Sequence, residues 1–277
     1  FEEIGMLAGV AYDEGGIARA GMGVDAVDFD RIGRPSLVVG NFSNEMISLL
    51  RNEGNGLFID VAAPTLMGSA SFLTLAFGCF FFDADLDGWQ DLFVANGHVE
   101  NGITSVQEKV KYEQTPHLFL SAYEGSRFDD VAQIAGFTTP LVGRGAAYGD
   151  LDGDGDLDVV VTSNGGAARV YRNDSLGGNA LRLVLRGDRE RADAVAATAT
   201  VETPDGSQTL VVRAGGSYCS HSDAALTFGL AEANTAMRVD VTFPSGRSYQ
   251  FNDMAAGQTV EVVEGKGIAR QWSFEER

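Results

Sequence analysis

The sequence of 277 residues predicts an all-β protein in which blades of a β-propeller precede a small β-sandwich. Two observations lead to this prediction. An acidic, glycine-containing turn that leads at once into an apolar strand occurs three times, starting at Asp28, Asp83 and Asp150. Residues 179–264 contain at least five short segments that alternate in polarity or are β-branched, which is typical of a sandwich.

The three turns define a repeat, because they lie 55 and 67 residues apart and are followed by similar strands. Two repeats end on related phrases, GLFIDVA at 56–62 and SRFDDVA at 126–132, and the chain opens on a similar phrase, FEEIG. Residues 1–178 are therefore expected to hold about three blades, the first of them entered in the middle of a repeat. Since a propeller ring needs at least about four blades, we expect this chain to be the C-terminal part of a longer protein.

The second and third turns have the spacing of a calcium loop. Each places carboxylates at positions one, three, five and nine, with a glycine at position six that permits a sharp turn, and position seven would add a backbone carbonyl. Converging carboxylates repel one another unless a cation binds them. The sequence thus predicts two structural Ca²⁺ ions, held by Asp83, Asp85, Asp87, Trp89 (carbonyl) and Asp91, and by Asp150, Asp152, Asp154, Asp156 (carbonyl) and Asp158.

Two other interpretations of these turns agree less well with the sequence. An EF-hand needs a glutamate at position twelve and flanking helices, but position twelve is Val94 or Val161 and the following residues indicate a strand. An acidic surface turn would explain one copy, and two copies with identical spacing make it the weaker explanation. The first copy keeps Asp28 and Asp30 but has Ile32 at position five and a serine at position nine, so we expect it to form its turn without metal.

The composition limits the partners. The net charge is -19, of which two calcium ions would offset only four units, and this argues against nucleic acid or an anionic membrane as a partner. No stretch is long and apolar enough to span a membrane. A calcium-rich location, extracellular, at the cell surface or periplasmic, fits this composition. The two cysteines, Cys79 in an apolar run and Cys219 in a polar one, are expected to remain separate thiols.

Several phrases resemble known families. Residues 1–178 resemble the FG-GAP (VCBS-type) blades of integrin-α-like propellers, and more closely the bacterial and animal proteins related to cartilage acidic protein, through AYDEGGIARAGMGVD (11–25), NFSNE (41–45), DLFVANGHV (91–99) and RGAAYGDLDGDGDLD (144–158). Residues 179–264 resemble the ASPIC/UnbV domain of that family, through GGSYCSHSD (215–223), LTFGL (226–230) and FPSGR (243–247). Cys219, His221 and Phe243 stand where the family usually has Leu, Gln and Trp.

Other polar residues give weaker signals. The insertion Glu100 to Thr115 separates two strands of one repeat and is the best candidate for a specific contact, whereas His98 and Asn96 are expected to hydrogen-bond the loop backbone. The cluster around His221 and Asp223 lacks a nucleophile elbow, so it is interpreted as a polar loop and not as a triad. The tail, residues 265–277, could either dock on the sandwich or remain free.

These observations lead to three functional hypotheses. The first is a secreted or cell-surface, calcium-stabilised module for binding or adhesion, whose partner is an extracellular protein or glycan. The second is an enzyme, related to polysaccharide lyases or to a natural-product pathway. No acid/base set is visible in these residues, so the catalytic site would lie in missing repeats. The third is a subunit of an extracellular assembly that associates through strand edges.

Overall fold

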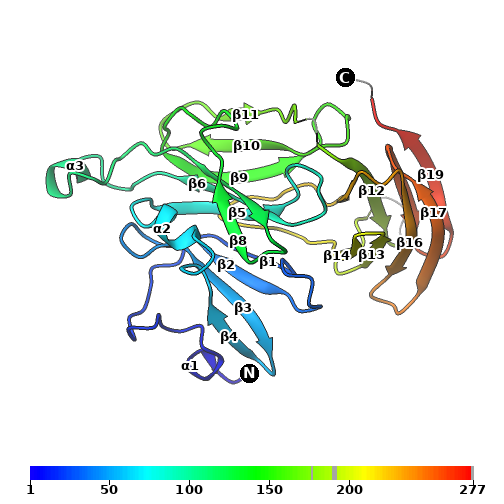
Figure 1. Ribbon diagram of the computed structural model, residues 1–277, viewed down its shortest axis with the longest axis horizontal. Helices are drawn as coiled ribbons and strands as arrows, with labels where there is room; N and C mark the ends of the chain where they lie inside the picture. The colour runs from blue at the N-terminus through cyan, green and yellow to red at the C-terminus, as the bar shows by residue number, and fades with distance from the viewer. Residues whose placement is uncertain (176, 189–191, 276–277) are drawn as a thin grey trace.

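The computed structural model describes residues 1–175, 177–188 and 192–275 (Figure 1). Within these residues the chain forms nineteen strands in five sheets, and its helices are single turns, α1 (Gly5–Ala8), α2 (Met67–Ser71) and α3 (Ile103–Val106). The predicted all-β class is confirmed. Among the described residues, no helix is long and apolar enough to cross a membrane.

Three antiparallel sheets are the predicted blades. The first blade contains β1 (Val24–Val27), β2 (Ser36–Val39), β3 (Ser48–Gly54) and β4 (Leu57–Asp60); the second contains β5 (Ala76–Phe82), β6 (Asp91–Asn96), β7 (His117–Ala122) and β8 (Arg127–Asp130); the third contains β9 (Gly143–Gly149), β10 (Asp158–Ser163) and β11 (Arg169–Tyr171). The strands of each blade pair in sequence order. The first strand of each blade is innermost, since β1 contacts β5 and β5 contacts β9.

The apolar run of β5 explains why the second blade is buried on both faces. Successive side chains of a strand point to opposite faces. Cys79 and Phe81 pack in a core shared with the first blade, whereas Phe80 and Phe82 pack in a core shared with the third blade. All seven residues of β5 are buried as a result, so the phenylalanine run belongs to the core of the blades.

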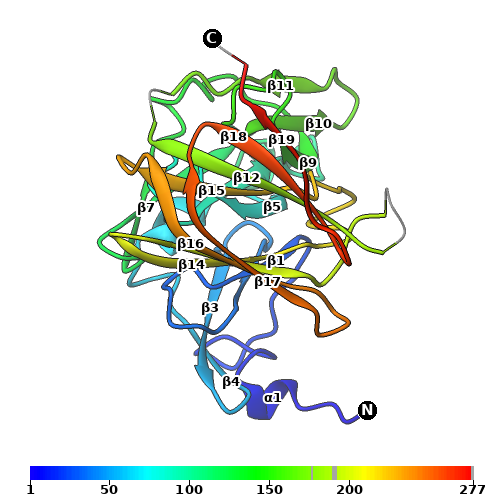
Figure 2. The ribbon, with the colours of Figure 1, turned by 90° about the vertical axis from the view of Figure 1, so that its right-hand side faces the viewer.

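The two remaining sheets form a sandwich, seen on its outer face in Figure 2. One sheet has the order β15-β12-β18-β19 and the other β14-β13-β16-β17, with β12 (Asn179–Arg186), β13 (Thr198–Thr203), β14 (Gly206–Val211), β15 (Leu226–Ala231), β16 (Thr235–Thr242), β17 (Ser248–Ala255), β18 (Gln258–Val263) and β19 (Gly267–Ser273). Buried residues of both sheets, such as Leu183, Phe228, Val201 and Val239, share one core. The described part of the tail is not free, because β19 pairs with β18.

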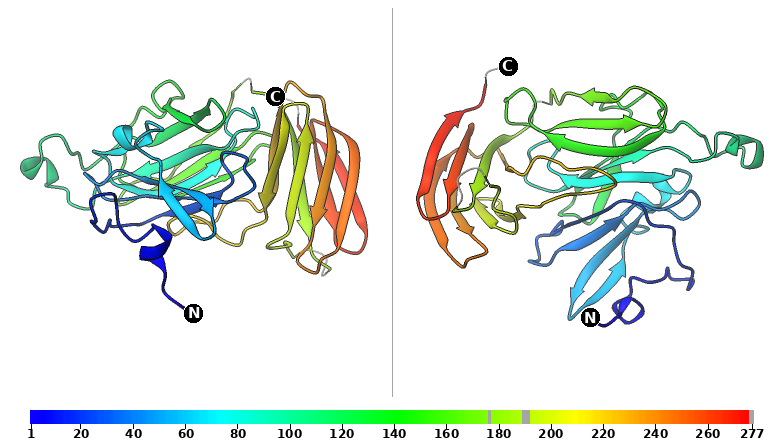
Figure 3. Two further views of the ribbon diagram at one scale, coloured as in Figure 1. Left: turned by 60° about the horizontal axis from the view of Figure 1, so that its bottom comes forward. Right: turned by 180° about the vertical axis from the view of Figure 1, so that it is seen from behind.

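The loop between β14 and β15, residues 212–225, leaves the sandwich and runs along the inner strands of the blades (yellow to orange in Figures 1 and 3). We call it the central loop. Ser217 Oγ accepts a hydrogen bond from the Cys79 N–H of β5, and Ser222 Oγ accepts one from the Tyr148 N–H of β9 at 3.2 Å. The Tyr218 ring lies 4.9 Å from that of Phe77. The central loop therefore connects the sandwich to the centre of the blades.

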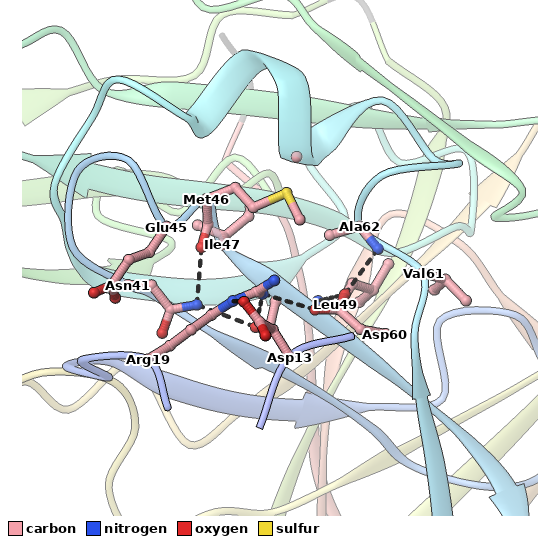
Figure 4. Close-up of polar contacts among 12 residues, drawn as sticks. Asp13, Arg19, Asn41, Glu45, Met46, Ile47, Leu49, Asp60, Val61 and Ala62 are labelled. Atoms are coloured by element: carbon pink, nitrogen blue, oxygen red, sulfur yellow. Dashed lines mark hydrogen bonds and ion pairs between the residues drawn. The ribbon is translucent and has the colours of Figure 1, made fainter. Parts of the chain in front are cut away.

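A largely buried arginine, Arg19, stabilises the first blade (Figure 4). The Arg19 guanidinium donates to Asp60 Oδ2 at 2.8 Å and to Ser48 Oγ at 2.7 Å, and its Nε lies 3.8 Å from Asp13 Oδ2. The second blade has a counterpart at the same repeat positions, in which His117 lies between Asp130 and Thr74. The first and second blades thus each tie the third strand to the aspartate that ends the fourth strand.

Replacing Asp60 with asparagine is expected to lower the free energy of unfolding by about 1–3 kcal/mol. Both side chains of the pair are largely buried, with 13% of Arg19 and 16% of Asp60 exposed, so the arginine would lose the nearer of its two carboxylate partners inside the protein. Urea unfolding measures the effect. Asp129→Asn is the matched control, because its ion pair with Arg127 is exposed and is expected to contribute less than about 1 kcal/mol. Equal losses for the two variants would contradict the prediction.

Candidate metal centres

Two acidic loops connect the first and second strands of their blades. The first acidic loop, residues 83–91, joins β5 to β6, and the second acidic loop, residues 150–158, joins β9 to β10. The strand register pairs Phe82 with Asp91, and Gly149 with Asp158. Each hairpin therefore brings the first and the last aspartate of its loop next to each other, as the sequence spacing suggests.

Three of the four predicted carboxylates converge in each loop. Oxygen atoms of Asp83, Asp85 and Asp91 lie within 4.8 Å of one another, and so do those of Asp150, Asp152 and Asp154. Asp87 and Asp158 are not among these groups. Asp87 Oδ1 instead accepts the Trp89 N–H at 2.7 Å. The carbonyl ligands predicted at Trp89 and Asp156 stay predictions.

The aspartate at position nine has a structural task that the sequence reasoning missed. Asp91 accepts the Ala84 N–H at 2.8 Å with one oxygen and the Ser121 N–H at 2.7 Å with the other. Asp158 repeats this arrangement in the third blade, with the N–H groups of Leu151 and Asn173, both at 2.8 Å. Position nine therefore ties the loop to the third strand of its blade, and each carboxylate oxygen retains a lone pair for a cation.

The first acidic loop is the more buried of the two. Asp83 is 2% exposed and Asp91 is 1% exposed. Burial, and then repulsion from neighbouring carboxylates, raises the pKa of both groups well above the usual value for aspartate. Asp83 Oδ2 accepts the Gly88 N–H at 2.9 Å, but its Oδ1 is buried without a hydrogen-bond partner. A bound cation would satisfy this oxygen and offset the repulsion, so the donor set fits calcium.

The second acidic loop is more open and lies beside arginines. Arg182 of β12 lies 3.5 Å from Asp150 Oδ2 and also pairs with Asp223 of the central loop. Burial raises the pKa of Asp150, and the charge of Arg182 opposes that rise. The tail covers the same loop, because the Glu275 N–H donates to the Gly153 carbonyl at 2.8 Å. The second acidic loop is thus held from two sides by the C-terminal sandwich and its tail.

The degenerate loop, residues 28–36, keeps the turn without a carboxylate cluster. Asp28 accepts the N–H groups of Ile32 at 3.1 Å and Gly33 at 2.8 Å. At position nine, the Ser36 hydroxyl accepts the Asn52 N–H at 3.0 Å, where the other blades use an aspartate. Within the described residues, no group of three acidic side chains converges at this loop.

The first acidic loop also faces the sandwich. A Cβ atom added to Gly229 of β15 would lie 2.1 Å from Asp83 Oδ2. The Ala231 N–H donates to the Leu86 carbonyl, and the Gly178 N–H donates to the Asp85 carbonyl, both at 3.0 Å. Both candidate metal loops therefore lie where the blades meet the sandwich. Gly229 in the phrase LTFGL is the sequence signal that could have indicated this contact.

The other polar residues singled out in the sequence lie at the end of a strand or in loops. The Asn96 amide donates to the Thr115 carbonyl at 2.9 Å, and His98 Nδ1 accepts the Glu100 N–H at 3.0 Å, which agrees with the expected loop-backbone contacts. In the central loop, His221 Nδ1 accepts the Gly215 N–H at 2.8 Å, which is a contact within a polar loop. Cys79 and Cys219 are free thiols. The insertion with α3 extends away from the blades (Figure 1).

Comparison with known proteins agrees with this architecture. The FG-GAP-like repeat family matches residues 83–161, and the ASPIC and UnbV family matches residues 187–269. Cartilage acidic protein 1 of Homo sapiens is 26% identical over 254 residues, which cover 88% of this chain and 36% of the human protein. The Mus musculus protein of the same name is 26% identical over 237 residues, which cover 82% of this chain and 34% of the mouse protein.

The matched regions coincide with the two parts of the fold. The FG-GAP-like match runs from the first residue of the first acidic loop to β10, and the ASPIC and UnbV match includes most of the sandwich and the central loop. The chain spans about a third of the length of the curated relatives it matches. Residues 83–161 of this chain thus match the FG-GAP-like repeat family, residues 187–269 match the ASPIC and UnbV family, and most of the chain is similar to cartilage acidic protein 1.

Proposed function

We propose that this protein is an extracellular binding module whose blades and sandwich are held together by two structural Ca²⁺ ions. The observation that carries the proposal is the first acidic loop, where three carboxylates converge within 4.8 Å and the buried Asp83 Oδ1 has no hydrogen-bond partner. Without a cation, two such charges about 4 Å apart would repel by roughly 4 kcal/mol at an effective dielectric constant of 20. Calcium is the common cation that prefers several oxygen ligands.

Because of where the two loops lie, ions bound in them would also affect the packing of the sandwich on the blades. Each loop contacts the C-terminal sandwich, the first through Gly229 and the second through Arg182 and the tail. An ion that fixes a loop would therefore also fix the surface on which the sandwich packs. Binding to the native state alone stabilises that state in proportion to the logarithm of ion concentration. The proposed role of calcium is structural, and not catalytic.

The proposed location and partners rest on charge and similarity. The net charge of -19 disfavours nucleic acid and anionic membranes as partners, and the similar animal proteins are named as acidic proteins of cartilage. An extracellular protein or glycan is the proposed partner. The insertion with α3 is the proposed contact surface, because it extends from a blade and exposes Val106, and Val99 just before it is exposed as well.

Metal content tests the proposal. Dialysed protein is expected to retain about two calcium ions per chain by elemental analysis, and calorimetric titration after chelation should recover both sites. Asp83→Asn and Asp150→Asn are each expected to remove one site, because each change removes a converging carboxylate. Asp28→Asn in the degenerate loop is the matched control and should retain both. Absence of calcium, or unchanged stoichiometry in the first two variants, would contradict the proposal.

A further inference from the structure

Arg31 of the degenerate loop contacts the first acidic loop of the next blade. Its backbone has φ of 55°, and the end of its side chain contacts Gly88 and Trp89. The Nη2 atom donates a hydrogen bond to the Gly88 carbonyl. The guanidinium carbon lies 3.8 Å from the centroid of the Trp89 ring, which is the geometry of a cation–π contact.

These contacts place a fixed positive charge beside the candidate calcium ligands. Gly88 and Trp89 occupy positions six and seven of the first acidic loop. The carboxylates of Asp83 and Asp87 attract the guanidinium, and the half-buried arginine has its pKa lowered by burial against this attraction. Arginine remains protonated under such conditions. The loop therefore contains an internal cation before any metal binds.

The guanidinium is confined to this position. A Cβ atom added to Gly88 would lie 2.8 Å from Arg31 Nη2 and 2.8 Å from Gln208 Nε2 of the sandwich. Nη1 lies 3.7 Å from the corresponding point on Gly206, the first residue of β14. Arg31 is thus enclosed by the first acidic loop on one side and by the sandwich on the other, so a bound ion could not simply displace it into solvent.

We propose that Arg31 sets the calcium affinity of the first acidic loop by acting as a fixed positive charge that the neighbouring blade contributes to the site. The inference rests on the proposed calcium function. The charge stabilises the ion-free loop through attraction to Asp83 and Asp87, and it repels the incoming divalent ion. Both effects make the free energy of calcium binding less favourable and so weaken the binding. The degenerate loop of the first blade has lost its own carboxylate cluster and instead weakens ion binding in the second blade.

The charge and the shape of this side chain can be separated by substitution. Arg31→Gln removes the charge but retains an N–H donor for the Gly88 carbonyl, whereas Arg31→Lys keeps the charge and loses the planar stacking on Trp89. Arg34→Gln is the matched control from the same loop, because Arg34 contacts the Asn52 carbonyl of its own blade. A Trp272→Phe background leaves Trp89 as the only tryptophan and therefore as a fluorescent reporter of the first acidic loop.

Calcium titration of these variants, followed by Trp89 emission and by calorimetry, tests the inference. Arg31→Gln is expected to bind calcium at the first loop about three- to tenfold more tightly than the parent, and Arg31→Lys and Arg34→Gln are expected to match the parent. Unchanged or weaker binding in Arg31→Gln would overturn the inference, and so would equal tightening in Arg31→Gln and Arg31→Lys. Thermal melts check that each variant is folded. A parent protein that binds no calcium would refute the proposed function itself.

Discussion

Asparagine at position 83 is expected to destabilise the protein in calcium and to stabilise it in a chelator. In calcium, the change removes a converging carboxylate from the first acidic loop, so the stabilisation supplied by the ion is lost. In the chelator, it removes a charge that is 2% exposed and lies beside two other carboxylates. The amide nitrogen could also donate to a neighbouring carboxylate from the place where Asp83 Oδ1 has no partner.

The two effects are large enough to be measured separately. At a calcium concentration of about one hundred times Kd, loss of the ion costs roughly 2.7 kcal/mol of stability. In the chelator, removing one of several neighbouring buried negative charges should raise the free energy of unfolding by about 1–3 kcal/mol. Thermal and urea unfolding of the parent and of Asp83→Asn, each with calcium and with chelator, measure the four values. A shift of the same sign in both conditions would show that Asp83 contributes to the fold in some way other than through an ion.

Asp28→Asn provides the matched control for this comparison. Asp28 occupies position one of the degenerate loop, where it accepts the backbone N–H groups of Ile32 and Gly33. Asparagine retains an oxygen for one of these hydrogen bonds, and no third carboxylate converges at this loop in the described part of the chain. The control should therefore respond to calcium as the parent does. If Asp28→Asn also destabilised the protein in calcium and stabilised it in the chelator, the effect would come from removing acidic charge in general.

The acidic loops were predictable because their ligand spacing is local. A carboxylate at every second residue, a glycine at position six and a strand on either side determine the turn, and three of the four carboxylates converge in each loop. The roles of Asp91 and Asp158 were not predictable in the same way. Their partners include the N–H groups of Ser121 and Asn173, which belong to or follow the third strand and lie 30 and 15 residues further along the chain. Spacing within the loop contains no information about such contacts.

The central loop shows a second limit of the sequence. The sequence predicts a polar loop around His221 and Asp223, but it does not indicate that two serines of this loop accept backbone N–H groups of inner strands. Ser217 and its partner Cys79 are 138 residues apart. An innermost strand leaves backbone N–H groups without a partner inside its own sheet, and buried N–H groups need an acceptor. Ser217 and Ser222 supply acceptors to β5 and β9. The central loop is thus polar because the innermost strands of the blades need hydrogen-bond acceptors. These strands are distant in the sequence, so the local sequence of the loop does not indicate this need.

Gly78→Ala adds only one methyl group to β5, but it is expected to lower the free energy of unfolding by about 2–4 kcal/mol. The added Cβ on β5 would lie 2.8 Å from both the Ala146 nitrogen and the Arg144 carbonyl oxygen of β9. Both are backbone atoms, so no side-chain rotation relieves the overlap. The inner strands would have to separate, and this would also disturb the hydrogen bonds of β5 and β9 to the central loop.

The matched control for this prediction is Gly216→Ala in the central loop itself. Its added Cβ would have no atom within 4 Å, and its backbone does not require a positive φ. Its free energy of unfolding should therefore change by less than about 0.5 kcal/mol. Urea unfolding gives both values, and hydrogen exchange at the Cys79 and Tyr148 amides should quicken in Gly78→Ala alone. Equal stability of the two variants would mean that the inner strands can separate without cost, and the close approach of β5 and β9 would then not be what holds the central loop in place.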